Sequence, residues 1–468
     1  MKLHPSPIMS LPTEDASLDQ SRIPELNDQL PERKHYFQLD VLKAIAIAFV
    51  VLDHSLTWDI KHAIGGPFWE RTSIPFFLLV MGFNMGISFR YSGATTLREL
   101  YSREYFSKKV KRYVFPFILL YALSILAGFY FHSLEFNQYS LIGWLPFWGP
   151  GNWFIPVVLS SIFVFPAVYW AFTKSPKVTV LLCFLSEIFL QFIMFIAAPL
   201  ILVNGSYVYF NAEAIFLTTV IRTNILFLLP AVAMGLWFSS GFDLKDERNR
   251  FMAAAFPLSF VYLVAYQFFD FRFAIINGIY RYNLIWGDYT FLVYPYSALI
   301  FLLAMKYLPS TPQNRLHGFI SKIGRATYHI FLFQIFYFSV WYFNNPGFEN
   351  VGFGSDVLLH LPFYLVNLTL TFIGGLTWYT IEHRSPNTVL RAVWWSGALF
   401  SLLGMGAAIE VVSTLTGLMD YWERPFFVLN WRTGPGVMAN FITILFFLGL
   451  TTFCIWRGFE AGVEEIPV

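Results

Sequence analysis

Long apolar runs recur along the chain from residue 39 onward, each followed by a shorter polar segment. The runs are roughly 17–25 residues long, which is enough for a helix to cross the hydrocarbon core of a bilayer. We predict about twelve transmembrane helices, at 39–57, 72–91, 113–132, 153–172, 178–202, 215–238, 252–269, 289–308, 326–344, 358–381, 393–415 and 436–456. The pattern therefore predicts an all-α, polytopic transmembrane bundle.

The composition supports a membrane protein. Hydrophobic residues make up 56% of the 468 residues and charged residues only 13%, against about 25% charged in soluble proteins. The net charge of +2 and the lack of a long basic domain argue against nucleic acid as a partner. Cys183 and Cys454 lie in apolar runs outside any CxxC or Cys/His cluster. We therefore predict no disulfide framework and no metal site.

The distribution of Lys and Arg predicts the orientation. Segment 90–112 holds seven basic residues, whereas 132–152 and 345–357 hold none. Basic loops stay on the cytoplasmic side, so both termini are predicted to be cytoplasmic. Residues 1–35 carry five prolines and no continuous apolar h-region. They are predicted to form a flexible cytoplasmic tail rather than a signal peptide.

The first predicted helix carries Lys43 and His54, eleven residues apart, with Asp40 and Asp53 beside them. Eleven residues are close to three helical turns, so both side chains fall on one face, roughly 16 Å apart. Because an ammonium group and an imidazole are costly inside a membrane, the pair indicates a functional site. In the alternative interpretation Lys43 snorkels to the interface and His54 caps the helix end.

Six segments resemble, in order, motifs of the acyltransferase-3 family of integral membrane acyltransferases. LDVLKAIAIAFVVLDH at 39–54 is similar to the first-helix motif with a basic residue and a histidine, with Lys43 in place of the commoner arginine. The other segments are IPFFLLVMGFNMG at 74–86, YFSKKVKRYVFPF at 105–117, NWFIPVVLSSIFVFP at 152–166, IGRATYHIFLFQ at 323–334 and WYTIEHRSP at 378–386. Met81 replaces a family serine and Gln334 the usual histidine, and Pro386 is displaced.

The resemblance implies an acyltransferase core over 36–386 and two additional helices within 387–468. It implies that His54 is the central catalytic residue, with Lys43 and Asp40 as further catalytic candidates, and that Lys109 and Arg112 bind the acyl donor. Histidine suits this role because its unperturbed pKa lies near the working pH. His54 either deprotonates the acceptor hydroxyl as a general base or takes the acyl group itself. Asp53 is a candidate to orient the imidazole ring.

The basic cluster of Lys108, Lys109, Lys111 and Arg112 has two interpretations. It sets the topology, or it holds the phosphates of a cytosolic acyl-coenzyme A, and we predict both roles together. Lys43 is placed to contact the donor as well.

Other polar or aromatic side chains in the predicted spans are supporting candidates. Glu187 and Gln191 share one helix face, where they line an acceptor path or form interhelical hydrogen bonds. Asn84 has the same two interpretations. Trp153 is expected to pack near the site, and Glu382 to form a salt bridge with the basic loop.

The sequence thus predicts a membrane O-acyltransferase that moves an acyl group, with acetyl as the first choice, from acyl-coenzyme A to a hydroxyl of a glycan or lipid-linked acceptor. The acceptor rests on the resemblance alone. A twelve-helix transporter that uses Lys43 and His54 as a proton relay or substrate site is the main rival, although no paired half-repeats are visible. A pseudoenzyme or acyl-group translocator is a third interpretation, because Met81 and Gln334 depart from the family pattern. Membrane lipids are expected partners, and a homodimer stays open.

Overall fold

The computed structural model describes residues 35–131, 133–135, 137–147, 149–197, 202–203, 206–207, 212–269, 289–344, 357–383, 448–449 and 451–457. The chain divides into two compact units, 1–35 and 36–468, and all elements named below belong to the second. Residues 1–34 of the predicted tail, the predicted helix 393–415 and most of the predicted helix 436–456 lie outside the described residues.

The described part of the chain is almost entirely helical, as predicted. In chain order its elements are α1 (Phe37–Ser55), α2 (Trp58–Ala63), α3 (Gly66–Ser92), α4 (Leu97–Leu100), α5 (Arg103–Lys109), the π-helix η3 (Val110–Val114), α6 (Phe115–Tyr130), α7 (Gln138–Leu141), α8 (Phe154–Lys174), α9 (Pro176–Ala197), β1 (Leu202–Val203), β2 (Ser206–Tyr207), α10 (Ala212–Arg222), the 3₁₀ turn η5 (Ile225–Leu228), α11 (Leu229–Ser239), the 3₁₀ turn η6 (Glu247–Asn249), α12 (Met252–Phe269), α13 (Tyr294–Tyr307), α14 (Arg315–Asn344) and α15 (Val357–His383). The strands β1 and β2 form a short antiparallel pair.

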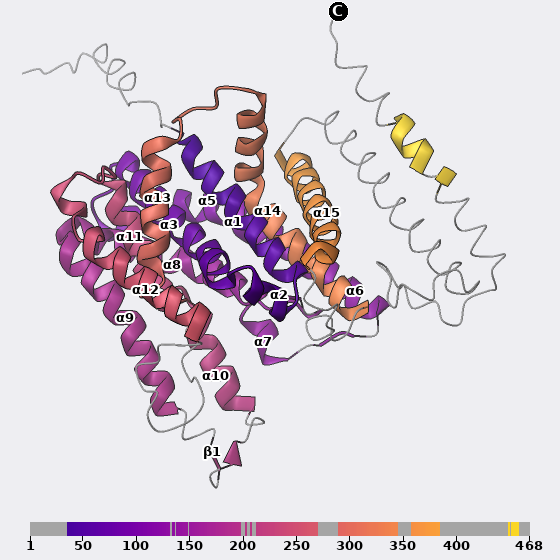
Figure 1. Ribbon diagram of the computed structural model, residues 1–468, viewed down its shortest axis with the longest axis horizontal. Coiled ribbons are helices and arrows are strands. Elements are labelled where there is room, and N and C mark those ends of the chain that lie inside the picture. Colours follow the sequence, from indigo (N-terminus) through magenta and orange to yellow (C-terminus); the bar gives the residue numbers. More distant parts are fainter. Residues whose placement is uncertain are drawn as a thin grey trace, which may run out of the picture. The chain divides into compact units, whose positions relative to one another are not determined.

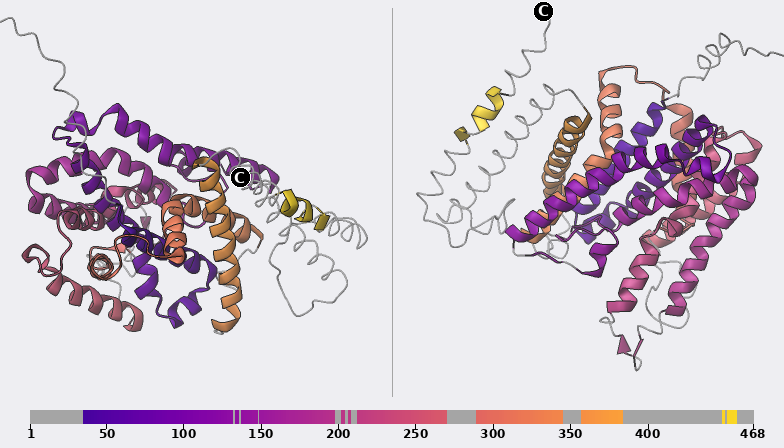
Figure 2. Two further views of the ribbon diagram at one scale, coloured as in Figure 1. Left: turned by 90° about the horizontal axis from the view of Figure 1, so that it is seen from above. Right: turned by 180° about the vertical axis from the view of Figure 1, so that it is seen from behind.

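Helix α1 is central to the packing. It contacts α3, α14 and α15, and Figure 1 shows it between α3 and α14. Its buried residues include Leu39, Leu42, Ala46, Ile47 and Val50, a spacing that places an apolar stripe on one helix face. In the rear view of Figure 2, α6 runs across this group, where it contacts α14.

The direction of the central helices follows from their side-chain contacts. The hydroxyl of Ser321, near the start of α14, donates to Asp40 near the start of α1. The hydroxyl of Tyr342, near the end of α14, donates to the carbonyl of His54 near the end of α1. The two helices therefore run in the same direction. Helix α15 runs in the opposite direction, because its Asn367 meets Tyr337 of α14 whereas its later residue Glu382 meets the earlier residue His329.

Glycines bring the backbones of α3 and α11 into contact. A Cβ atom on Gly82 would lie 2.0 Å from the carbonyl oxygen of Val232, and a Cβ atom on Gly235 would lie 2.0 Å from the carbonyl oxygen of Leu79. Small residues of this kind allow membrane helices to approach closely. The α3–α11 packing thus depends on glycine in both helices.

Five described helical segments are long and apolar enough to cross a membrane. They are Gly66–Ser92, Leu97–Tyr130, Phe154–Lys174, Pro176–Ile193 and Glu247–Phe269. These segments and the helical content agree with the predicted class of a membrane helix bundle. The count of about twelve spans and the cytoplasmic termini stay predictions.

One predicted helix is interrupted. The run 215–238 was expected to form a single helix, but the structure divides it into α10, η5 and α11. The side chain of Asn224 accepts a hydrogen bond from the backbone N–H of Leu226 and begins a new turn, as asparagine at a helix N-cap commonly does. Pro230 then lies in the first turn of α11, where its missing N–H costs nothing.

Candidate active site

Helix α1 carries two polar clusters, one near each end. Lys43 and Asp40 belong to the first cluster, and Asp53 and His54 to the second. Because Lys43 and His54 lie on one regular helix, the rise per residue places them about 16 Å apart along its axis. The clusters are therefore separate sites on a shared helix.

Asp40 anchors the first cluster. Its carboxylate is fully buried, pairs with Lys43 Nζ at 2.9 Å and accepts a 2.6 Å hydrogen bond from the hydroxyl of Ser321. Gly324 lies against the backbone of Asp40, where a Cβ atom would come within 2.5 Å of the aspartate Cα. Asp40 therefore positions Lys43 and connects α1 to α14.

Lys43 faces residues 108–113, which we call the basic segment. It interacts electrostatically with Arg112 and Tyr113, and the hydroxyl of Tyr328 donates to the carbonyl of Tyr113 at 2.9 Å. Lys109 Nζ and Arg112 Cζ lie 5.5 and 5.4 Å from the centroid of the Tyr113 ring, within cation–π range. Lys43, Lys109 and Arg112 thus gather around Tyr113, and we call these three residues the cationic cluster.

The four predicted donor-binding cations do not behave alike. Lys108 is 74% exposed and pairs with Glu104 one turn away, and Lys111 and Arg112 are also exposed. By contrast, Lys109 is half-buried and packs between the rings of Tyr105 and Tyr113. Lys109 immediately precedes the π-helix η3 (Val110–Val114), and Arg112 lies within it; such turns occur frequently at functional sites.

His54 lies in the last turn of α1. Its ring is 15% exposed, and its centroid is 5.6 Å from that of Phe338 in an edge-to-face arrangement. Nδ1 of His54 is 3.5 Å from the carboxylate of Asp53. That distance is too long for a strong hydrogen bond, so Asp53 acts on the imidazole ring mainly through its charge.

Asp53 belongs to a wider group of charges at this end of α1. Lys61 Nζ lies 2.7 Å from the Asp53 carboxylate, and both side chains are largely buried. Arg71 pairs with Glu70 at 2.8 Å, is also an electrostatic neighbour of Asp53, and donates to the hydroxyl of Tyr266. The sequence analysis missed Lys61, Glu70 and Arg71, because they precede the predicted second span and resemble ordinary loop charges.

Buried hydrogen bonds hold the end of α1 in place. The side-chain amide of Asn367 in α15 donates to the hydroxyl of Ser55 at 3.0 Å and accepts from the hydroxyl of Tyr337 in α14 at 2.7 Å. Tyr342 donates to the carbonyl of His54 at 2.9 Å. Because buried polar groups are costly when left unpaired, this network fixes the position from which His54 projects.

The remaining predicted residues lie farther from the two clusters or support them. Gln191 donates to Glu187 at 2.9 Å within α9, and the same carboxylate oxygen accepts from the backbone N–H of Phe291. This arrangement favours the hydrogen-bonding interpretation of that pair. Asn84 is half-buried in α3. Trp153 packs against the ring of Tyr289, over which the guanidinium of Arg71 also lies.

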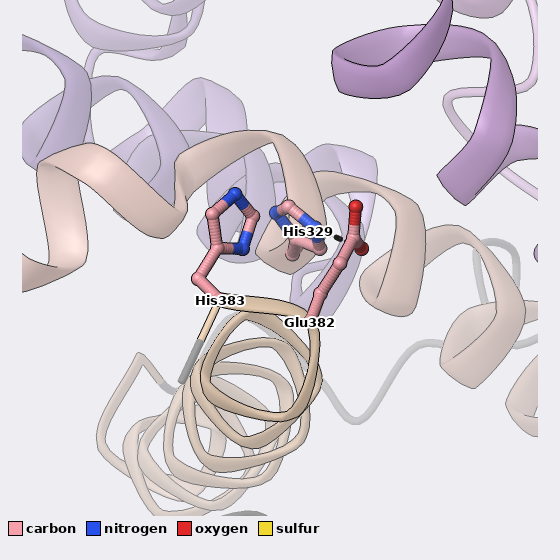
Figure 3. Close-up of side chains that lie close together, drawn as sticks. All are labelled: His329, Glu382 and His383. Atoms are coloured by element: carbon pink, nitrogen blue, oxygen red, sulfur yellow. Dashed lines mark hydrogen bonds and ion pairs between the residues drawn. The ribbon is translucent and has the colours of Figure 1, made fainter. Parts of the chain in front are cut away.

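Glu382 has a different partner from the one expected. The salt bridge to the basic loop is not what the structure shows, because the carboxylate lies 2.9 Å from Nε2 of His329 in α14. His383 adjoins the pair, as Figure 3 shows. The close α14–α15 packing explains this partner, since Gly375 lies directly against Ile330 and Gly374 against Phe333.

The two clusters offer different chemistry. The cationic cluster provides ammonium and guanidinium donors suited to phosphate oxygens. The His54 end provides an imidazole held next to a carboxylate, a combination suited to proton transfer or nucleophilic attack. The groups suited to binding an anion and the imidazole suited to proton transfer or nucleophilic attack thus lie near opposite ends of α1.

Comparison with known proteins gives the family of the chain. The family model of the acyltransferase-3 family, described as an acyltransferase domain, matches residues 36–351, which is more than half of the chain. No curated protein and no solved structure matches the chain. The match includes α1 through α14, and with them both clusters. The chain therefore belongs to the acyltransferase-3 family of membrane acyltransferases.

Proposed function

We propose that the protein is a multi-pass membrane O-acyltransferase that moves an acyl group, with acetyl as the first choice, from cytosolic acyl-coenzyme A to a hydroxyl of a glycan or lipid-linked acceptor. The observation that carries this proposal is the arrangement of α1, with the cationic cluster near its start and His54 in its last turn. Both termini are placed in the cytoplasm, as the distribution of basic residues predicts.

The donor would bind with its phosphates at the cationic cluster. Lys109 and Arg112 lie over one tyrosine ring, and Lys43 interacts with that tyrosine from α1. Three cations that converge from separate elements attract a polyanion more strongly than isolated surface lysines, which solvent screens. Lys108 and Lys111, which are exposed, contribute to the topology signal.

The separation of the clusters suits the shape of the donor. In an acyl-coenzyme A the thioester lies at the far end of the pantetheine arm from the nucleotide phosphates. The rise of α1 places His54 about 16 Å from Lys43, so an extended donor is able to contact both. The length of an extended donor thus explains how a thioester from the cytosol would reach His54 at the opposite end of α1.

The transfer step requires a group that accepts a proton or the acyl group. As a general base, His54 would take the proton of the acceptor hydroxyl while the hydroxyl oxygen attacks the thioester carbonyl. The coenzyme A thiolate leaves and recovers that proton. In the alternative route an imidazole nitrogen of His54 attacks the thioester carbonyl and the coenzyme A thiolate leaves. The acceptor hydroxyl then takes the acyl group from the imidazole, and its proton neutralises the thiolate. In both routes a cationic imidazole forms, and the charge of Asp53 at 3.5 Å stabilises it.

Aromatic rings beside the His54 end support a hydroxyl-bearing acceptor. Arg71 lies over the rings of Tyr266 and Tyr289, and Tyr289 packs against Trp153. Aromatic faces and charged hydrogen-bond donors together provide apolar contact and polar orientation for a ligand. We place the acceptor on this side of the protein.

The experiment is turnover of radiolabelled acetyl-coenzyme A in membranes that carry the wild-type protein, His54→Ala or His62→Ala. His62 is an exposed histidine in α2 and is the matched control. We expect labelled glycan or lipid from the wild type and from His62→Ala, and none from His54→Ala at equal insertion. Normal transfer by His54→Ala would refute the central role of His54. Substrate flux without any covalent label would point to a transporter.

A further inference from the structure

A cluster of two histidines and a carboxylate lies outside the two sites on α1. One ligand-type atom from each of His329, Glu382 and His383 can be chosen so that all three lie within 4.8 Å of one another. His329 comes from the middle of α14, and the other two residues form the last turn of α15. Figure 3 shows His329 between the two α15 side chains. The cluster therefore connects two helices.

The spacing is close to that of a shared metal ion. Zinc binds nitrogen and oxygen ligands at about 2.0–2.1 Å, so two ligands in a tetrahedral site lie about 3.3 Å apart. Nε2 of His329 and the carboxylate of Glu382 are already 2.9 Å apart. His383 is exposed at the end of its helix, so a small movement of its ring completes the set.

A hydrogen bond prepares His383 for a ligand. Nδ1 of His383 lies 3.0 Å from the carbonyl oxygen of Tyr379. Because a carbonyl only accepts, Nδ1 carries the proton and Nε2 keeps a free lone pair. Histidines that bind metals commonly donate their second nitrogen to such an oxygen. The Tyr379 ring also stacks on His383 at 4.4 Å between centroids. Nε2 of His329 shares a proton with the carboxylate of Glu382, and an ion that binds both groups releases this proton. In the described part of the chain, Nδ1 of His329 is buried without a hydrogen-bond partner.

The charges around the cluster select the kind of ion. Arg112 interacts electrostatically with His329 and opposes a bound cation, whereas the carboxylate of Glu382 favours one. Two imidazoles and one carboxylate form a borderline ligand set that prefers zinc and similar transition-metal ions over magnesium or calcium, which favour oxygen ligands. Magnesium and calcium would bind this ligand set too weakly to overcome the electrostatic repulsion from Arg112.

We propose that His329, Glu382 and His383 bind one zinc-type divalent ion, which joins the end of α15 to α14. The neighbouring residue of α14, Tyr328, donates to the carbonyl of Tyr113, so the ion would also stabilise the region beside the basic segment. The proposal does not depend on the acyl donor or acceptor.

The experiment measures binding of Zn²⁺ and Co²⁺ to the purified full chain in the absence of any acyl donor. Stoichiometry comes from metal analysis and affinity from calorimetry, and the visible spectrum of bound Co²⁺ reports its coordination. The variants are His383→Ala and Glu382→Gln, and exposed His62→Ala is the matched control for adventitious binding by histidine. Glu382→Gln keeps a side chain of the same shape but removes the anionic ligand.

We expect one equivalent of ion, with a four-coordinate Co²⁺ spectrum, for the wild type and His62→Ala. Both site variants should bind at least about 10-fold more weakly. A Tm that rises with Zn²⁺ and saturates in the wild type and in His62→Ala, but not in the two site variants, would confirm the link between the helices. Failure of the wild type to bind would overturn the proposal, as would unchanged affinity in His383→Ala. Because no acyl donor is present, neither result bears on the proposed transfer activity.

Discussion

Removal of the charges of Lys109 and Arg112 is expected to weaken donor binding strongly. Removal of the charges of Lys108 and Lys111 is expected to weaken it only slightly. The test variant is Lys109→Gln with Arg112→Gln, and the matched control is Lys108→Gln with Lys111→Gln. Each pair removes the same net charge from the same short segment. The pairs differ because Lys109 and Arg112 lie over the ring of Tyr113, whereas Lys108 pairs with Glu104 on the surface and Lys111 is exposed.

The magnitude follows from the contacts that are lost. A hydrogen bond to a charged group contributes about 1.5–3 kcal/mol, and we take the lower end because water reaches part of both side chains. Two such contacts contribute about 3 kcal/mol, which corresponds to a rise in KM of roughly 100-fold. The control pair provides only screened, surface electrostatics, so its KM should change by about threefold or less.

The assay compares two donors in the same membranes. Acetyl-coenzyme A carries the nucleotide phosphates, and acetyl-pantetheine lacks them. The double variant at Lys109 and Arg112 should raise the KM for the first donor and leave that for the second unchanged, with kcat affected less than KM. Equal losses in the two variant pairs, or an equal loss with both donors, would refute a phosphate site at the cationic cluster.

Three further outcomes follow from the contacts of α1. Gly324→Val forces a side chain against the backbone of Asp40 and should lower stability by about 1–3 kcal/mol, measured as a lower Tm in detergent. Asn367→Leu removes the hydrogen bond to Ser55 and one from a neighbouring tyrosine, and calorimetry should show a loss of about 2 kcal/mol. Asp53→Asn should lower kcat about 10-fold or more while the donor KM stays nearly constant, because the carboxylate acts on the imidazole and not on the phosphates. A changed KM with normal kcat would contradict that role.

The first helix was predictable because its signals are local. The apolar run predicted a helix at 39–57, and the structure has it at Phe37–Ser55. Helical periodicity placed Lys43 and His54 on one face with Asp40 and Asp53 beside them, but their division into two clusters became visible only in the structure. The break within 215–238 had local signals too, since Asn224 and Pro230 are visible in the sequence. The apolar character of that run outweighed them in the prediction.

Contacts between distant parts of the chain were not predictable in this way. Four of the five residues at 108–112 are basic. Which of them gather with Lys43 depends on the π-helix η3 and on the position of Tyr113, and neither is visible in the sequence. Glu382 meets His329, 53 residues earlier, because glycines allow α14 and α15 to pack closely. Partner choice of this kind depends on helix packing, which a single sequence does not encode in its local pattern.

The parallel arrangement of α1 and α14 bears on the membrane topology. Asp40 meets Ser321 at the start of both helices, and His54 meets Tyr342 at their ends. Two membrane helices run in the same direction only when an odd number of crossings lies between them. The sequence predicts seven between 39–57 and 326–344, and the run 215–238 must count once despite its break. Cysteines placed at Lys108 and Arg315 should therefore be labelled from the same side of the membrane, and labelling from opposite sides would refute this count. On this topology the cationic cluster and the end of α15 lie on the cytoplasmic side, from which the proposed donor would arrive, and His54 lies toward the opposite face.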